Sequence, residues 1–156
     1  MSATPADRPY AVLDIDGVLA DVSHRLHYLA PGRKNWDAFF AAAPKDPPLA
    51  EGVEVALTLA RDHDIAYVTG RPARYRGDTL AWLAEHGLPP GLLIMRTAGD
   101  RRPAELTKLG AIRRLASTRP VAVVVDDDPD VCAAVRKAGF TVFEATWAPT
   151  EPDSTD

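Results

Sequence analysis

Residues 10–19 read Tyr-Ala-Val-Leu-Asp-Ile-Asp-Gly-Val-Leu, an apolar run that ends in two aspartates and a glycine. The apolar part has the length and composition of a buried strand. Asp14 and Asp16 follow it directly, and Gly17 permits a tight turn that brings the backbone close to a ligand. Residues i and i+2 of a strand point to the same side, so we expect both carboxylates to flank one reacting atom.

Four more short apolar runs follow this one along the chain, and amphipathic stretches separate them. The runs span residues 65–68, 92–95, 121–125 and 141–143. Between them apolar residues recur three or four positions apart, as Val53, Ala56 and Ala60 do, which is typical of a helix that packs on a sheet. This alternation predicts an α/β fold, a three-layer Rossmann-like parallel sheet of about five strands with helices on both faces.

The length of the chain, 156 residues, suits one domain, which we place at residues 10–147. Residues 1–9 and 148–156 are polar and contain prolines, so we predict flexible tails there. A segment at about residues 20–49 separates the first strand from its packing helix. It is too short for a domain, and we predict that it forms a small helical insert.

Polar side chains follow the predicted strands, and ligands of an open parallel sheet bind beyond the carboxyl ends of its strands. Carboxylates follow the first strand and also the fourth, where Asp126 and Asp127 stand. A hydroxyl group and cations follow the second and third strands. Thr69, Gly70 and Arg71 come after the second strand, and Arg96, Arg101 and Arg102 come after the third, with Lys108 in the next helix. We expect all of these groups to meet at one edge of the sheet.

This division of charge has a chemical meaning. Adjacent carboxylates repel one another, and a hard divalent cation such as Mg²⁺, which prefers oxygen ligands, relieves the repulsion. Arg71, Arg102 and Lys108 then offer hydrogen-bond donors to an anion. A metal beside cations is what phosphoryl transfer requires, because its transition state spreads negative charge over oxygen atoms.

The ordered motifs resemble those of the haloacid dehalogenase (HAD) superfamily over about residues 10–147. They are the strings at 14–19 and 69–71, Lys108, and the pair at 126–127. Longer strings resemble the phosphatase domain of phage-type polynucleotide kinase/3′-phosphatases. These lie at residues 24–27 (His-Arg-Leu-His), 36–40 (Trp-Asp-Ala-Phe-Phe), 69–72 (Thr-Gly-Arg-Pro) and 99–102 (Gly-Asp-Arg-Arg).

The resemblance implies a phosphomonoester hydrolase that removes 3′-phosphates from polynucleotide ends. It implies that Asp14 is the nucleophile and forms a phosphoaspartate. Asp16 then protonates the departing oxygen and afterwards activates water. Thr69 and Lys108 hold the phosphoryl group that is transferred.

The resemblance also implies a Mg²⁺ cofactor and a set of substrate contacts. Asp14, Asp126 and the backbone carbonyl of Asp16 are the implied metal ligands, with Asp127 nearby or ligating through water. Arg25 and Arg71 match functional arginines of the polynucleotide phosphatases. With Gly70 and Arg102 they form the predicted substrate-binding set.

Other interpretations of the same residues stay open. Mononucleotides or other small phosphate esters are the alternative substrates. A phosphoacceptor signalling domain is disfavoured, because its acceptor aspartate follows the third strand and none does so here. A non-catalytic phosphate-binding relative is the remaining alternative. The aromatic residues Trp36, Phe39 and Phe40 fit an anchor for the insert, and base stacking by one of them is the second interpretation.

Composition limits the setting of the protein. A net charge of −4 argues against a wholly basic nucleic-acid-coating protein, although a local arginine track remains. The single cysteine, Cys132, excludes an internal disulfide. No apolar run approaches the roughly 20 residues of a membrane span, and a cytoplasmic location fits best. No Walker-type phosphate loop is present, so a separate kinase or ligase is the expected partner; the oligomeric state stays open.

Overall fold

A computed structural model of the chain describes residues 8–149. The predicted tails at 1–9 and 148–156 therefore lie mainly outside the described residues. The described part contains a five-stranded sheet with the order β3-β2-β1-β4-β5, and every pair of neighbouring strands is parallel. The strands are β1 Tyr10–Leu13, β2 Asp64–Pro72, β3 Gly91–Arg96, β4 Val121–Asp126 and β5 Val142–Glu144.

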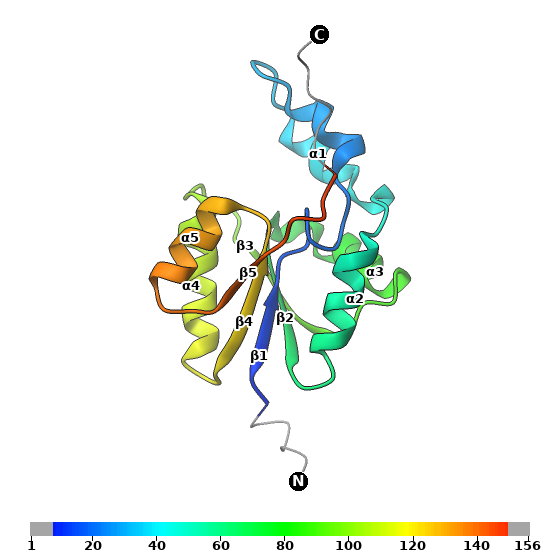
Figure 1. The fold of residues 1–156 in the computed structure, drawn as a ribbon. Coiled ribbons are helices and arrows are strands. Elements are labelled where there is room, and N and C mark those ends of the chain that lie inside the picture. Colours follow the sequence, from blue (N-terminus) through cyan, green and yellow to red (C-terminus); the bar gives the residue numbers. More distant parts are fainter. Residues whose placement is uncertain (1–7, 150–156) are drawn as a thin grey trace.

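Helices cover both faces of this sheet, as the sequence predicts (Figure 1). The pair α2 (Ala50–Leu59) and α3 (Arg76–Glu85) lies on one face, and the pair α4 (Ala104–Ala116) and α5 (Pro129–Lys137) lies on the other. Alternate residues of the central strand supply the two cores: Ala11 and Leu13 pack on one side, and Tyr10 and Val12 on the other. The three-layer prediction is thus confirmed, with the last strand shifted by one residue.

The segment between β1 and α2 lies beyond the carboxyl ends of the strands (Figure 1). It contains the 3₁₀ turns Ser23–Leu29 and Ala43–Lys45 and one short helix, α1 (Trp36–Ala41). The Asn35 side chain accepts a hydrogen bond from the Ala38 N–H at 3.0 Å and so caps the first turn of α1. The Phe39 ring is 7% exposed and anchors the helix, as predicted, whereas Trp36 is 49% exposed.

Because the side chains of β1 are buried, we expect them to contribute strongly to the stability of the fold. Leu13 is 0% exposed, so Leu13→Ala should lower the free energy of unfolding by about 2–5 kcal/mol through lost contacts and a cavity. Urea unfolding measures this value. Leu92→Ala is the control, because Leu92 on β3 is 48% exposed and its truncation should change stability by no more than ~0.5 kcal/mol. Equal effects at both positions would contradict this account of the core.

Candidate active site

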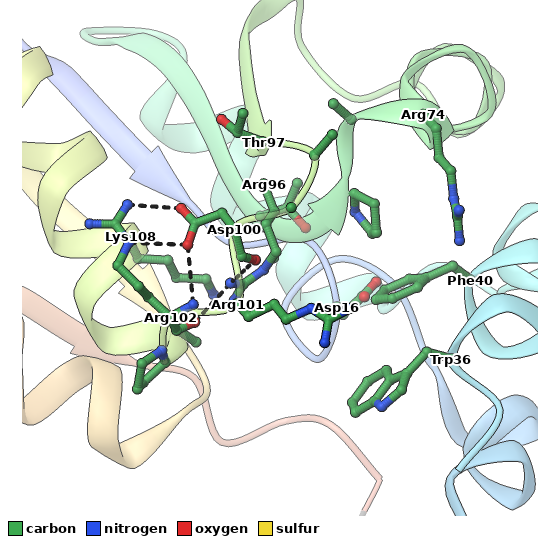
Figure 2. A pocket seen from close by; sticks show the side chains of 18 of the residues that line it. Asp16, Trp36, Phe40, Arg74, Arg96, Thr97, Asp100, Arg101, Arg102 and Lys108 are labelled. Carbon is green, nitrogen blue, oxygen red and sulfur yellow. Dashed lines mark hydrogen bonds and ion pairs between the residues drawn. The ribbon is translucent and has the colours of Figure 1, made fainter.

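A pocket of about 970 Å³ opens at the carboxyl ends of β1, β2 and β3 (Figure 2). Asp14, Asp16 and Lys108 line it together with residues of α1 and of the loop between β3 and α4. Parallel strands end at the same edge of the sheet, which is why motifs far apart in the sequence meet there. The volume lies near the upper end of the roughly 300–1,000 Å³ that small-molecule pockets span, so the pocket has room for more than a phosphate group.

Three carboxylates meet at the buried end of this pocket. Oxygen atoms of Asp14, Asp126 and Asp127 all lie within 4.8 Å of one another. Gly17 makes this approach possible: its φ is +81°, and a Cβ atom there would lie 2.0 Å from Oδ2 of Asp127. The glycine predicted to allow a tight turn therefore serves both the turn and the packing of the acidic cluster.

Lys108 neutralises part of this negative charge. Its ammonium group lies 2.8 Å from Oδ2 of Asp126 and 3.1 Å from Oδ1 of Asp14. Burial raises the pKa of Asp14 well above its usual range; the Lys108 charge opposes this effect, while the neighbouring carboxylates add to it. Burial, followed by the charge of Asp126, raises the pKa of Asp127 to about 6.

The donor set fits a hard divalent cation. Three carboxylates within ligand distance of one another are poorly ionised together, because within residues 8–149 only one ammonium group faces them. A cation such as Mg²⁺ takes oxygen ligands and would stabilise their ionised forms. Asp14, Asp126 and Asp127 are the residues that would hold it. The Asp16 carboxylate is not part of this group; its predicted role as ligand concerns only its backbone carbonyl.

Asp16 faces two buried arginines instead. Its Oδ1 accepts hydrogen bonds from Nη2 of Arg25 at 2.9 Å and from Nε and Nη2 of Arg71 at 3.0 and 2.6 Å. Burial acts to raise the pKa of Asp16, but the charges of Arg71 and Arg25 outweigh it, so the pKa is lowered. Arg25 and Arg71 are 0% and 1% exposed, so in this structure they position Asp16 and present no cationic surface to solvent.

Asp46 completes this network, and the sequence analysis missed it. Its carboxylate is fully buried and accepts from Nε and Nη2 of Arg25 at 2.9 and 2.8 Å. Nη2 of Arg71 lies 3.4 Å away, and Nε2 of His24 lies 2.6 Å from Oδ1. The signal in the sequence was a lone aspartate before a proline pair, a pattern more typical of a turn.

Thr69 and Gly70 line the same pocket, but they lie within β2, which continues to Pro72 with an irregularity after Val68, and do not follow the strand as the sequence predicts. The Thr69 Oγ1 accepts a hydrogen bond from the Arg71 N–H at 3.2 Å, which leaves its hydroxyl proton available to a ligand. Asp128 caps the start of α5: its carboxylate accepts a hydrogen bond from the Asp130 N–H at 2.9 Å, and Pro129 follows it. It takes no part in the acidic cluster.

Arg96 at the end of β3 and Arg101 and Arg102 in the loop that follows have different environments. Arg102 forms a two-point ion pair with Asp100, with its Nε and Nη2 at 3.0 and 2.8 Å from the two carboxylate oxygens. Arg96 donates from Nη1 to the backbone carbonyls of Asp100 and Arg102 at 3.1 and 2.8 Å. Arg101 has no hydrogen bond or ion pair within residues 8–149, and it lines the pocket (Figure 2). The predicted substrate contact Arg102 is thus already neutralised by Asp100.

Comparison with known families finds one match, which covers almost the whole domain. A family described as the phosphatase domain of polynucleotide kinase PNKP matches residues 9–147. Comparison with curated proteins finds no match. Among the described residues, no helix is long and apolar enough to cross a bilayer.

Solved structures share the fold at low sequence identity. One, titled as a Pnkp1/Rnl/Hen1 RNA repair complex, superposes with a TM-score of 0.74 at 22% identity; the match covers 92% of this chain and 44% of that chain. A class C acid phosphatase from Bacillus anthracis with tungstate bound gives 0.64 at 17% identity, with 90% and 68% covered. A HAD enzyme from Bacteroides thetaiotaomicron with magnesium and inorganic phosphate gives 0.52 at 8%, with 96% and 100% covered. The chain therefore spans less than half of the repair-complex protein that it resembles.

The Arg102–Asp100 pair predicts a measurable pKa. Arg102 hydrogen bonds lower the pKa of Asp100 to about 2 from its ordinary 3.8. Arg102→Gln should return it toward 3.8, as carboxyl chemical shifts across a pH titration would report. Because the pKa of Asp100 is lower in the folded state, the ion pair stabilises the loop at pH values above the ordinary pKa of the carboxyl group. This contribution is lost as the pH falls toward 2. Arg113→Gln on α4 is the control and should leave Asp100 unchanged; an unchanged Asp100 in Arg102→Gln would refute the pair.

The acidic cluster predicts that divalent cations stabilise the fold. At a Mg²⁺ concentration 100 times its Kd, the free energy of unfolding should rise by about 2.7 kcal/mol, measured from melting with and without the ion. Asp126→Asn removes one ligand and should abolish most of this rise. Asp130→Asn is the matched control, because Asp130 is exposed on α5 outside the cluster. The same response to Mg²⁺ in both variants would contradict the assignment.

Proposed function

The chain belongs to the family of polynucleotide kinase PNKP phosphatase domains, and on this basis we propose that it is a Mg²⁺-dependent phosphatase that removes 3′-phosphates from polynucleotide ends. Its fold is that of the HAD-type hydrolases. The observation that carries the proposal is the set of Asp14, Asp126 and Asp127 beside Lys108 at the buried end of a roomy pocket. Carboxylates for a metal and an ammonium group for an anion are what a phosphoryl group requires.

In the first half-reaction the Asp14 carboxylate attacks the phosphorus atom. The ester P–O bond breaks, the sugar oxygen leaves, and a phosphoaspartate forms on Asp14. Hydrogen bonds from the Ile15 N–H at 2.8 Å and the Lys108 contact at 3.1 Å fix the orientation of Oδ1 of Asp14. Mg²⁺, when bound, supplies positive charge next to the phosphoryl oxygens and favours the ionised nucleophile.

Lys108 and Thr69 are suited to hold the phosphoryl group during this transfer. The ammonium group has three N–H donors, and two of them face Asp14 and Asp126. The third can donate to a phosphoryl oxygen, as can the hydroxyl of Thr69 in β2. Both groups stabilise the negative charge that the transition state spreads over these oxygens.

Asp16 serves as the proton-transfer group. In the second half-reaction its ionised carboxylate takes a proton from water, the water oxygen bonds to phosphorus, and the bond to Asp14 breaks to release phosphate. Arg25 and Arg71 suit Asp16 to this step, since they favour its ionised form. To protonate the departing sugar oxygen in the first half-reaction, Asp16 first takes up a proton against these two charges.

A polynucleotide end is the substrate class that the pocket and the family support. The insert after β1 contributes only one short α-helix, α1, so the pocket stays open enough for a bulky ester. A chain of the Pnkp1/Rnl/Hen1 RNA repair complex shares this fold, which supports a role in end processing. A separate kinase or ligase is the proposed partner, because a ligase needs the 3′-hydroxyl that this reaction leaves.

Asp14→Asn should lower kcat by several orders of magnitude, because an amide does not attack phosphorus usefully. The measurement is phosphate release with Mg²⁺ from four substrates: a 3′-phosphorylated oligonucleotide, the same oligonucleotide with a 5′-phosphate, a 3′-mononucleotide and a 5′-mononucleotide. We expect the 3′-phosphorylated oligonucleotide to have the highest kcat/KM. Asp130→Asn controls for folding and should keep full activity.

Near-normal turnover by Asp14→Asn would refute the nucleophile. Equal kcat/KM values for the oligonucleotide and the 3′-mononucleotide would favour small phosphate esters as substrates. Wild-type protein that releases no phosphate from any of the four would refute the phosphatase assignment for this chain.

A further inference from the structure

We propose that Trp36 and Phe40 stack the terminal base of a single-stranded polynucleotide, while Arg101 binds the adjacent phosphodiester. The proposal rests on the proposed function, because it names the form of the polynucleotide end that the same site accepts. It assigns specificity to two walls of the pocket that lie away from the reacting groups (Figure 2).

The aromatic wall comes from α1. Trp36 is 49% exposed and lines the pocket, and its ring stacks on Phe40 with centroids 5.9 Å apart and planes 24° apart. Phe39 supports it from the core side, with its ring edge-on to Trp36 at 5.8 Å. Since the buried Phe39 already anchors the helix, the exposed indole of Trp36 is left over for a ligand.

The aromatic wall is also braced from the other side. The centroid of the Tyr75 ring lies 5.7 Å from that of Phe40. The preceding residue, Arg74, forms an ion pair with Asp37 of α1. These contacts tie α1 to the segment after β2. A preorganised aromatic surface loses little conformational freedom when a base stacks on it.

The opposite wall is cationic, and one of its cations has no partner in the part of the chain that the structure describes. Most of the cations that line the pocket are engaged within the protein: Arg74, Arg96, Arg102 and Lys108. Arg101 is exposed and has no hydrogen bond or ion pair among the residues that the structure describes. Figure 2 shows the Arg101 side chain directed from the loop after β3 toward the side of the pocket where Trp36 and Phe40 lie. An unpaired guanidinium facing a ring surface suits an anion that lies next to a base.

The two walls together select a single strand. Aromatic side chains that stack bases combine with positive charge along the backbone in proteins that bind single-stranded nucleic acid. In a duplex the terminal base is paired and stacked on its neighbour, so its faces are not free for Trp36 without an unpairing cost. A small phosphate ester would use only the buried end, at Asp14 and Lys108.

The test crosses a protein variant with a substrate variant. Wild type and Trp36→Ala are assayed for kcat/KM on two single-stranded 3′-phosphorylated oligonucleotides, one with a normal terminal nucleoside and one whose terminal nucleoside is abasic. Trp36→Ala should lower kcat/KM on the normal substrate by about 5- to 150-fold, the range that loss of one base stack gives. On the abasic substrate it should have little effect.

Two further variants separate stacking from support of the fold. Trp36→Phe keeps an aromatic surface and should retain most of the activity on the normal substrate. Leu57→Ala is the matched control, because Leu57 on α2 is 48% exposed, as Trp36 is, but does not line this pocket. It should leave both substrates unaffected.

Arg101 is tested through salt dependence. Arg101→Gln should raise KM for the oligonucleotide and reduce the slope of log KM against log salt by about 0.7, the value for one phosphate of a single strand. The 3′-mononucleotide lacks the adjacent phosphodiester and should be unaffected. Arg113→Gln, an exposed arginine on α4, is the control and should change neither.

Each outcome separates the two proposals. If the wild type hydrolyses normal and abasic ends equally well, or Trp36→Ala lowers both alike, the stacking surface is refuted and the phosphatase function stands. If the wild type cleaves a blunt duplex 3′-phosphate as fast as a single strand, selection of a single strand is refuted. If it cleaves none of these oligonucleotides, the proposed substrate fails, and the stacking proposal fails with it.

Discussion

The contact on which the site depends is that of Lys108 with two buried carboxylates at the end of the central strands. The ammonium group lies within 3.1 Å of both Asp14 and Asp126. Asp127 adds a third carboxylate, and no other cation of the described chain faces the three. Burying so much like charge costs free energy that packing alone does not return. A cation among the carboxylates would offset this cost, and this need for positive charge links the fold of the protein to its proposed chemistry.

A second network sets the chemical state of Asp16. Asp46 from the insert neutralises Arg25, and both arginines converge on Oδ1 of Asp16. The insert thus does more than border the pocket, because it supplies one arginine and the buried aspartate that hold Asp16, the proposed proton-transfer group. The same segment carries Trp36 on its exposed side. One short stretch of chain therefore carries both the residues that orient Asp16 and the aromatic wall that is proposed to bind the substrate.

Much of the fold and of the acidic site could be predicted, and the reasons are local. The run before Asp14 has the composition of a buried strand, and Gly17 has the positive φ that a tight turn uses. Asp14, Thr69, Lys108 and Asp126 meet because parallel strands end at one edge. Arginine environments could not be predicted in this way. Arg71 reads like a surface cation at a strand end, yet its guanidinium is buried against Asp16, and Arg102 is bound to Asp100 two positions away.

The order of the motifs along the chain and the periodicity of its apolar residues by themselves determined the layered sheet and singled out the candidate site residues, since both are properties of neighbours in sequence. Only the tertiary structure decided which charges pair. Asp46 meets Arg25 and Arg71 from 21 and 25 positions away, and no local pattern encodes such a distance. The tertiary structure also leaves Arg101, which lines the same pocket as Trp36, without a hydrogen bond or ion pair among the described residues. The sequence does not show this, because pairing depends on the packing of the whole chain.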